Sequence, residues 1–568
     1  MLDGVSASHN HMQSSSRSQY GVNTVAFPPY RAAFLLCQNY EVNLDSICHI
    51  LHKPSLRQNT ESFYLKLSQN EPVPLGQAAL LLAIFALSSF FYEPSPHSEV
   101  ARYDHEPTNL SRIFISSALD VLGHSSRTSS GCLEDVQAHI IMSFAVNQHE
   151  GFSSRGRLHV GAAVALSRDL GLHKIDSNAT SGSEYQYSAR IRIDREIKRR
   201  VFWYLAATDW YTCPPCFGSP YTDYYDRLAA SISGPQSGMY FIHPAQISVR
   251  LPKDCNDDTF LLCDDDSPVS TDRPTSMSHL LERVRLAHIC REMVEYLPLE
   301  ISKLQQVPYE HIVALDQKLV DYLSTLPFYF RLDVESRRRS RPLEDIDQNI
   351  TMLRFCITRA ALSRRIKLHQ CFLGRQSDDP RYAYSRQACL DSAQTVMQFY
   401  DGLADHHNAF IVSGRMAIAA HYMHLAMGVL VMDLCLNKNS ADEVQIKAQV
   451  KAGLKMFEDA RQRTPLLGQF LTSLQQILEK HQVYLNDNTI PTTVTTWDVG
   501  KTHDSGSEGL NGAVKVQLPP ATLHLPESQA LDFDTYFDDF WQNTIQADLN
   551  PELAAWDSLF SALDSRPI

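Results

Sequence analysis

The stretch REIKRRVFWYLAATDWYTCPPCFGSP, residues 195–220, begins with a helical pattern and ends with turn-forming residues. Apolar residues recur every three or four positions from Ile197 to Leu205, whereas Lys198 and Arg199 fall on another face. The Cys-Pro-Pro-Cys and Gly-Ser-Pro elements then stop the helix, because proline disfavours helix in the preceding residue and glycine permits a turn. The stretch therefore predicts an amphipathic helix with its stop signal.

Cys213 and Cys216 raise the alternative of a metal or redox site. Zinc takes four ligands, and the sequence contains no second Cys-x-x-Cys and no His-x-x-x-His pair. A redox Cys-x-x-Cys follows a strand and begins a helix, whereas this one ends a helix. The interpretation as a helix end is therefore favoured over both chemical alternatives.

Composition indicates a large folded intracellular protein. The chain has 568 residues, of which 44% are hydrophobic, and a length of roughly 150 residues per domain allows two to four domains. Twelve cysteines scattered through the chain read as reduced thiols, and the polar N-terminus lacks the apolar stretch of a signal peptide. The apolar run that begins at Leu75 contains Gln77 and two serines and is short for a membrane span. It predicts a buried core helix, and no membrane partner is expected.

A net charge of −13 argues against a free-standing nucleic-acid binder, which needs a basic face. Basic residues nevertheless cluster at 198–200, 336–342 and 363–367. The middle cluster falls in an expected loop and is a candidate nuclear-import patch, with a solvated surface as the alternative. Its arginines are Arg337, Arg338, Arg339 and Arg341.

Helical patterns dominate the chain and strand alternation is nearly absent, which predicts an all-α fold. Helices are expected at 30–51, 75–92, 108–123, 132–148, 155–171, 195–212, 277–297, 309–325, 346–369, 383–404, 410–437, 442–461 and 465–484. Loops are expected at 93–107, 176–190, 222–241 and 254–275. The sequence thus divides into a disordered arm (1–29), a helical domain (30–485), a polar linker (486–530) and a C-terminal tail (531–568).

Motifs of known enzyme classes do not occur. The glycines between 156 and 171 are not followed by the Lys-Ser/Thr of a phosphate loop, and the zinc-protease, Gly-x-Ser-x-Gly and dinucleotide patterns are missing. The three aspartates at 264–266 suggest Mg²⁺, but consecutive residues cannot share a helix face, so a solvated loop is favoured. His421 and His424 share a helix face but have no third ligand nearby. No catalytic or metal-binding residue is predicted, and an all-α enzyme without a recognisable motif is the main rival function.

Several segments, in a fixed order, resemble a known family. They are FLLCQNYEVNLDSICHILHKPSL (34–56), GRLHVGAAVALSRDLGLHKID (156–176), the stretch quoted first, and IHPAQISVRLPKDCND (242–257). Together they resemble the fungal-specific transcription factor domain, the helical middle region of fungal zinc-cluster activators, over roughly residues 30–480. The most specific part is Gly171-Leu-His173 followed by a set of motif residues. These are Arg199, Arg200, Phe202, Trp203, Asp209, Gly218 and Pro220.

In physical terms the motif residues read as structural. Phe202 and Trp203 suit a core helix face, and Asp209 is expected to accept hydrogen bonds from a neighbouring arginine. The resemblance implies a nuclear, non-enzymatic regulator of RNA polymerase II genes whose helical domain restrains the activator and senses a small-molecule effector.

Two departures from the family pattern stand out. Family members carry a DNA-binding module in which six cysteines hold two zinc ions, whereas Cys37 and Cys48 are the only cysteines before Cys132. Zinc and DNA binding are therefore implied by the family alone, and no cofactor is expected in this chain. Three alternatives for DNA binding stay open: a zinc module upstream of a truncated gene model, a DNA-binding partner, or a homodimer. Secondly, residues 222–241 read as an insertion, either a surface loop or a retained intron.

The tail interleaves aromatic and acidic residues, a composition typical of activation segments. Its aromatic residues are Phe533, Phe537, Phe540, Trp541, Trp556 and Phe560. Aspartates beside them keep the rings solvated until a partner's groove accepts them, which predicts binding to the transcriptional coactivator machinery. A tail helix docked on the protein's own core is the alternative, and a co-regulator recruited by a DNA-binding partner is the alternative function.

Overall fold

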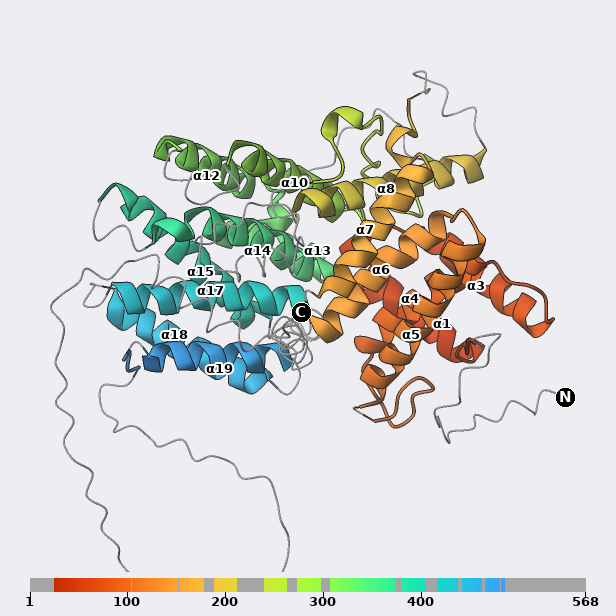
Figure 1. The fold of residues 1–568 in the computed structure, drawn as a ribbon, viewed down its shortest axis with the longest axis horizontal. Coiled ribbons are helices and arrows are strands. Elements are labelled where there is room, and N and C mark those ends of the chain that lie inside the picture. The colour runs from red at the N-terminus through yellow and green to blue at the C-terminus, as the bar shows by residue number, and fades with distance from the viewer. Residues whose placement is uncertain are drawn as a thin grey trace, which may run out of the picture.

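The computed structural model describes most of the helical region of the chain. The described residues are 25–103, 105–151, 153–177, 188–211, 240–262, 273–297, 307–373, 380–403, 416–437, 442–461, 465–480 and 482–485. Every regular element among them is a helix, so the all-α class is confirmed (Figure 1). Residues 1–24, nearly all of the expected insertion, the linker and the tail lie outside the described part.

The first group of helices surrounds the apolar run predicted as a core helix. It comprises α1 (Tyr30–Asn43), α2 (Asp45–Cys48), α3 (Lys53–Ser68), α4 (Leu75–Phe90), α5 (Glu106–Thr128), α6 (Leu133–Glu150) and α7 (Ser154–Asp169). Residues 78–89 of α4 are all buried, and α4 packs against α1, α5 and α6. Burying such a run removes apolar surface from water, the main force that assembles these helices. The prediction of a core helix is confirmed.

α8 (Ala189–Tyr211) joins the first group to the second. The second group comprises α10 (Ser278–Tyr296), α12 (Tyr309–Ser324), α13 (Val334–Glu344), α14 (Asn349–His369), α15 (Ala383–Leu403), α17 (Ala417–Leu436), α18 (Glu443–Ala460) and α19 (Pro465–Lys480). In Figure 1 the two groups lie on opposite sides of the molecule, and one continuous apolar core runs through both. α8 packs against α6 and α7 on one side and α10 on the other.

One glycine of the expected family motif has a clear structural role. α7 ends before Gly171, whose φ of 70° lies in the left-handed region that residues with a Cβ avoid. Its amide donates to the carbonyl of Arg168, and a short 3₁₀ helix, Leu172–Lys174, follows. The backbone of Ser248 then bonds His173 and Asp176, which ties this turn to the loop after α8.

Two helices were not predicted, and α13 corrects the expectation of a loop around residues 336–342. α13 buries Ser336, Ser340 and Glu344, so its buried stripe has helical spacing but no apolar residues. Arg354 of α14 explains this stripe, since it bonds both Ser340 and Glu344. α3 likewise buries few residues and follows His52, whose ring accepts a hydrogen bond from the Ser55 amide.

Among the described residues, one helix has the length and hydropathy of a membrane span. It covers Ala417–Cys435, and 94% of that window is buried inside the protein. Such burial is typical of a core helix, and α17 packs against α14, α15, α18 and α19.

Candidate functional site

Two tryptophans anchor the loop after α8 to the helix. The indole nitrogen of Trp203 donates to the Arg250 carbonyl at 2.8 Å, and that of Trp210 donates to the Ile242 carbonyl at 2.9 Å. Phe202, Trp203 and Trp210 are all buried, and the rings of Trp203 and Trp210 meet edge to face. These aromatic residues therefore fix the segment that returns from the expected insertion.

Asp209, beside Trp210 at the C-terminal end of α8, holds the same segment. Its Oδ2 accepts hydrogen bonds from the backbone amides of Phe241 and Ile242, both at 2.8 Å, whereas the sequence suggested a neighbouring arginine as the donor. Burial raises the pKa of Asp209 to about 6, although these two hydrogen bonds oppose the rise. The carboxyl thus acts as a two-amide clamp near neutral pH.

Asp209→Asn and Asp209→Ala form a matched pair that tests this clamp. Asparagine keeps an acceptor oxygen, whereas alanine leaves the part-buried amide of Phe241 and the buried amide of Ile242 without their acceptor, so we expect only the alanine variant to lose about 1–3 kcal/mol of unfolding free energy. Because the folded pKa is raised, the native state holds the proton more tightly than the unfolded chain does. The stability that this group contributes is complete below pH 4 and is lost as the pH rises through about 6.

Urea denaturation at pH 4.5 and pH 7.5 measures both effects. Wild type should lose stability relative to Asp209→Asn between these two values. If the asparagine variant is as unstable as the alanine variant, the acceptor oxygen at position 209 is not the cause of the lost stability.

The basic cluster at 198–200 is not a surface patch, which corrects the placement of Arg199 on a polar face. Arg199 and Arg200 are 3% and 1% exposed. Arg199 bonds both oxygens of Asp176, the shorter contact being 2.7 Å. Arg200 donates to Asp257 at 2.7 Å and to Glu196 at 3.2 Å. Asp176 and Asp257, which are distant in sequence, help to hold these arginines inside the protein.

The candidate import arginines are accessible, but they lie on helix α13 and not in a loop. Arg337, Arg338, Arg339 and Arg341 are all exposed. Arg338 pairs with Glu335 at 2.7 Å, and the guanidinium of Arg339 lies 4.0 Å from the ring centre of Phe328. The surface that an import receptor would contact is therefore a helical one.

The other candidate residues fall into two sets. Gly218, Pro220, the Cys-Pro-Pro-Cys element and all six tail aromatics lie outside the described residues. His421 and His424 are buried on α17, and burial lowers the pKa of His424 to about 3 while its ring stacks on Phe470. Within the described ranges, no group of three His, Cys, Asp or Glu residues is placed to hold a metal.

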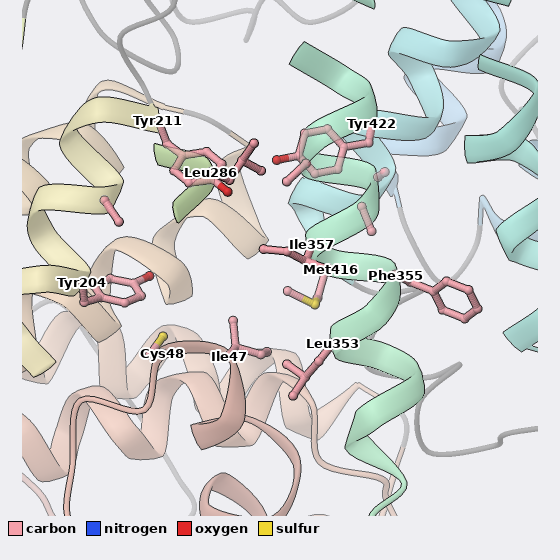
Figure 2. Packing of buried hydrophobic residues seen from close by; sticks show 14 of the residues in the cluster. Ile47, Cys48, Tyr204, Tyr211, Leu286, Leu353, Phe355, Ile357, Met416 and Tyr422 are labelled. Atoms are coloured by element: carbon pink, nitrogen blue, oxygen red, sulfur yellow. The ribbon is translucent and has the colours of Figure 1, made fainter. Parts of the chain in front are cut away.

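A cavity of about 190 Å³ lies where the two helix groups meet, between α2, α6, α7, α8, α10, α14 and α17. Aromatic and apolar side chains form much of its wall: Phe144, Tyr204, Tyr211, Ile357, Met416 and Tyr422. In Figure 2, Tyr204 and Tyr211 project from α8 on one side of the view, and Ile357, Met416 and Tyr422 lie on the other side. A concave site with apolar walls and a few polar groups is the usual form of a small-molecule site.

Basic side chains also line this cavity. They are Arg157 from α7, Arg283 from α10, and Arg359, Arg364 and Lys367 from α14. The cluster predicted at 363–367 therefore contributes to an internal site. Sequence analysis missed the cavity because seven helices supply its wall, and no local motif links them.

Comparison with known proteins places this helical domain in a family. A family model for the "Fungal specific transcription factor domain" matches residues 38–213. The probable transcription factor lepB of Aspergillus flavus is 36% identical over 96% of this chain and 94% of its own length. The chain therefore belongs to the fungal transcription factors that carry this domain, and it is a transcriptional regulator.

Other relatives are longer and more distant. The agnestins biosynthesis cluster transcription factor AgnL11 of Paecilomyces divaricatus is 26% identical, and the match covers 76% of this chain and 59% of that protein. The transcription factor TAS2 of Pyricularia oryzae is 27% identical, with 73% and 53% covered. The solved structure of the K. lactis CBF3 core superposes with a TM-score of 0.53 at 10% identity, over 81% of this chain and 86% of that one. That likeness shows a shared fold alone.

Proposed function

We propose that this transcription factor is a nuclear, non-enzymatic activator of RNA polymerase II genes whose helical domain senses a small molecule. The observation that carries the proposal is the cavity between the two helix groups. A ligand there contacts α6 and α7 of the first group and α10, α14 and α17 of the second, so binding favours one packing of the groups over others. A domain that restrains an activator needs such a ligand-dependent element.

The chemistry of the cavity favours binding over catalysis. General acid–base catalysis needs a group that exchanges a proton near the working pH. His279 lines the cavity, but burial and the charge of Arg283 lower its pKa to about 3. The remaining ionisable lining residues that the structure describes are arginine, lysine, tyrosine and Cys356, whose pKa burial raises to about 11. These groups suit recognition of a ligand.

The tail supplies the activation segment in this proposal. Residues 531–568 combine the aromatic anchors with aspartates, and aromatic anchors usually carry most of the binding energy in grooves that accept such helices. The proposed partners are the coactivator machinery, which binds the tail, and a component that directs the protein to DNA. That component is a zinc-cluster module, a DNA-binding partner or a second copy of the chain. The arginines of α13 serve as the import patch.

A reporter assay tests the tail. Residues 531–568 fused to an unrelated DNA-binding module should activate transcription, and changing Phe537, Phe540 and Trp541 together to Ala should remove most of the activity. Asp538→Asn with Asp539→Asn is the matched control and should reduce activity less, because these charges mainly assist encounter. A silent fusion, or a triple variant as active as its parent, would favour a tail that docks on its own core.

A further inference from the structure

The cavity between the helix groups carries an excess of positive charge. Five of its lining residues are arginine or lysine, and none of the lining residues that the structure describes is aspartate or glutamate. Arg359, Arg364 and Lys367 are buried, with exposed fractions of 2%, 5% and 8%. Removing a cation from water is unfavourable unless an anion or several acceptors compensate it.

Arg364 has neutral partners. It donates to the backbone carbonyl of Tyr211 at 2.9 Å, to the hydroxyl of Tyr422 at 3.3 Å and to that of Ser363 at 2.8 Å. Its Nε is buried without a hydrogen-bond acceptor. The guanidinium therefore lies in the protein interior, and no carboxylate of the described residues is bonded to it.

Arg283 lies beside the same tyrosine. It donates to the hydroxyl of Thr208 at 2.7 Å, and its Nε is also buried without an acceptor. Its guanidinium lies 5.1 Å from the ring centre of Tyr211, and that of Arg364 lies 4.8 Å from the same ring. Two guanidinium groups from α10 and α14 thus approach one aromatic side chain, and an anion bound to both would offset their like charges.

The pKa values of two neighbouring histidines are lowered, mainly by burial and further by this positive charge. Burial lowers the pKa of His279 to about 3, with a further contribution from Arg283. Burial also lowers the pKa of His421 on α17 well below its ordinary value, and Lys367 and Arg364 contribute. Both rings are neutral at physiological pH, so the charge of the cavity comes from its arginines and lysine.

The size and walls of the cavity limit what it can hold. A cavity of about 150 Å³ in another protein accepts benzene. The 190 Å³ here therefore suits a single ring or short aliphatic chain with one acidic arm. Aromatic walls from Tyr204 and Tyr211 suit the apolar part, and guanidinium groups suit a carboxylate because they donate two parallel hydrogen bonds.

We propose that the effector site of this domain binds a small organic acid whose carboxylate is held by Arg283 and Arg364. This inference rests on the proposed function, in which the helical domain senses a small molecule. The bound carboxylate links α10 to α14 through one anion and offsets the repulsion between their arginines. Its apolar part lies against the aromatic wall on α8.

Three fluorinated probes with the same ring test the charge preference on the full chain. They are 4-fluorophenylacetate, 4-fluorophenylacetamide and 2-(4-fluorophenyl)ethylamine, and ¹⁹F NMR line broadening at physiological salt reports their binding. We expect the carboxylate to bind at least about tenfold more tightly than the amide, because ionic hydrogen bonds are stronger, and the amine not to bind. Equal binding of carboxylate and amide would overturn the organic-acid inference while retaining a small-molecule sensor. Failure of all three probes would count against both.

Single substitutions locate the site. Arg364→Gln and Arg283→Gln should each weaken carboxylate binding about tenfold without weakening the amide, and Arg364→Lys should retain part of the affinity because it keeps the charge. Arg338→Gln on exposed α13 is the matched control and should leave binding unchanged. Thermal melting of each free variant separates loss of the site from loss of the fold, and the two glutamine variants report independently. Unchanged carboxylate binding in both folded glutamine variants would overturn the assignment.

Discussion

Trp203→Ala is expected to lower the free energy of unfolding by about 3–5 kcal/mol, a large share of the total for a typical domain. Trp203 is 7% exposed, and its ring meets those of Phe202, Trp210 and His288. Alanine leaves a large cavity at the junction of α8 and α10. It also removes the donor to the Arg250 carbonyl, so the loop after α8 loses one of its anchors.

Two further variants make this expectation specific. Trp203→Phe keeps much of the ring volume but not the donor, and it should cost less than alanine. Ile346→Ala, at a position that is 86% exposed, should change stability by less than about 0.5 kcal/mol. Chemical denaturation of the three variants gives the order. If Trp203→Ala unfolds at the same denaturant concentration as Ile346→Ala, the core role of Trp203 is wrong.

Helices with an apolar stripe were predictable from the sequence. α4 and α17 are apolar on nearly every face, and both are core helices, as their composition indicates. α13 was not predicted because the residues that it buries, Ser336, Ser340 and Glu344, are all polar and leave no apolar stripe in the sequence. Its helical spacing becomes meaningful only once Arg354 is known to lie beside it, and that arginine belongs to another helix.

The positions of charged side chains were harder to predict from the sequence than those of apolar side chains. An arginine in a basic run is usually solvated, but burial depends on partners that the local sequence does not reveal. Arg199 is buried because Asp176 lies 23 residues away in sequence and 2.7 Å away in space. Arg364 is buried on the wall of a cavity whose residues range from Ile47 to Tyr422. The approach of Arg283 and Arg364 to the ring of Tyr211 likewise becomes visible only in the assembled fold.

Arg200 is the centre of a buried ionic network that joins α8 to segments on either side of it. It donates to Glu196 within α8, to Asp257 in the following loop and to the carbonyl of Leu51. His49 lies 3.2 Å from the guanidinium and bonds Asp45 at 2.7 Å. Four titratable groups thus share one interior site with Arg200, and each depends on its neighbours for compensation.

Arg200→Met is expected to destabilise the protein by about 3–5 kcal/mol near neutral pH, because it leaves the carboxylates of Glu196 and Asp257 buried without their guanidinium. Arg338→Met is the matched control, and because its pair with Glu335 is exposed to solvent, its loss should leave stability close to that of wild type.

The pH dependence of the destabilisation identifies its cause. Burial alone would raise the pKa of Asp257, but hydrogen bonding to His49 and the charge of Arg200 outweigh it and hold that pKa well below its usual range. The stability from this carboxylate is therefore present above pH 4 and is lost as the pH falls towards the depressed pKa. In the variant both carboxylates lose the Arg200 guanidinium and take up protons more readily, so the difference in stability from wild type should narrow below pH 4. A gap that stays constant across the acid range in urea titrations would mean that lost packing, and not an uncompensated charge, causes the destabilisation.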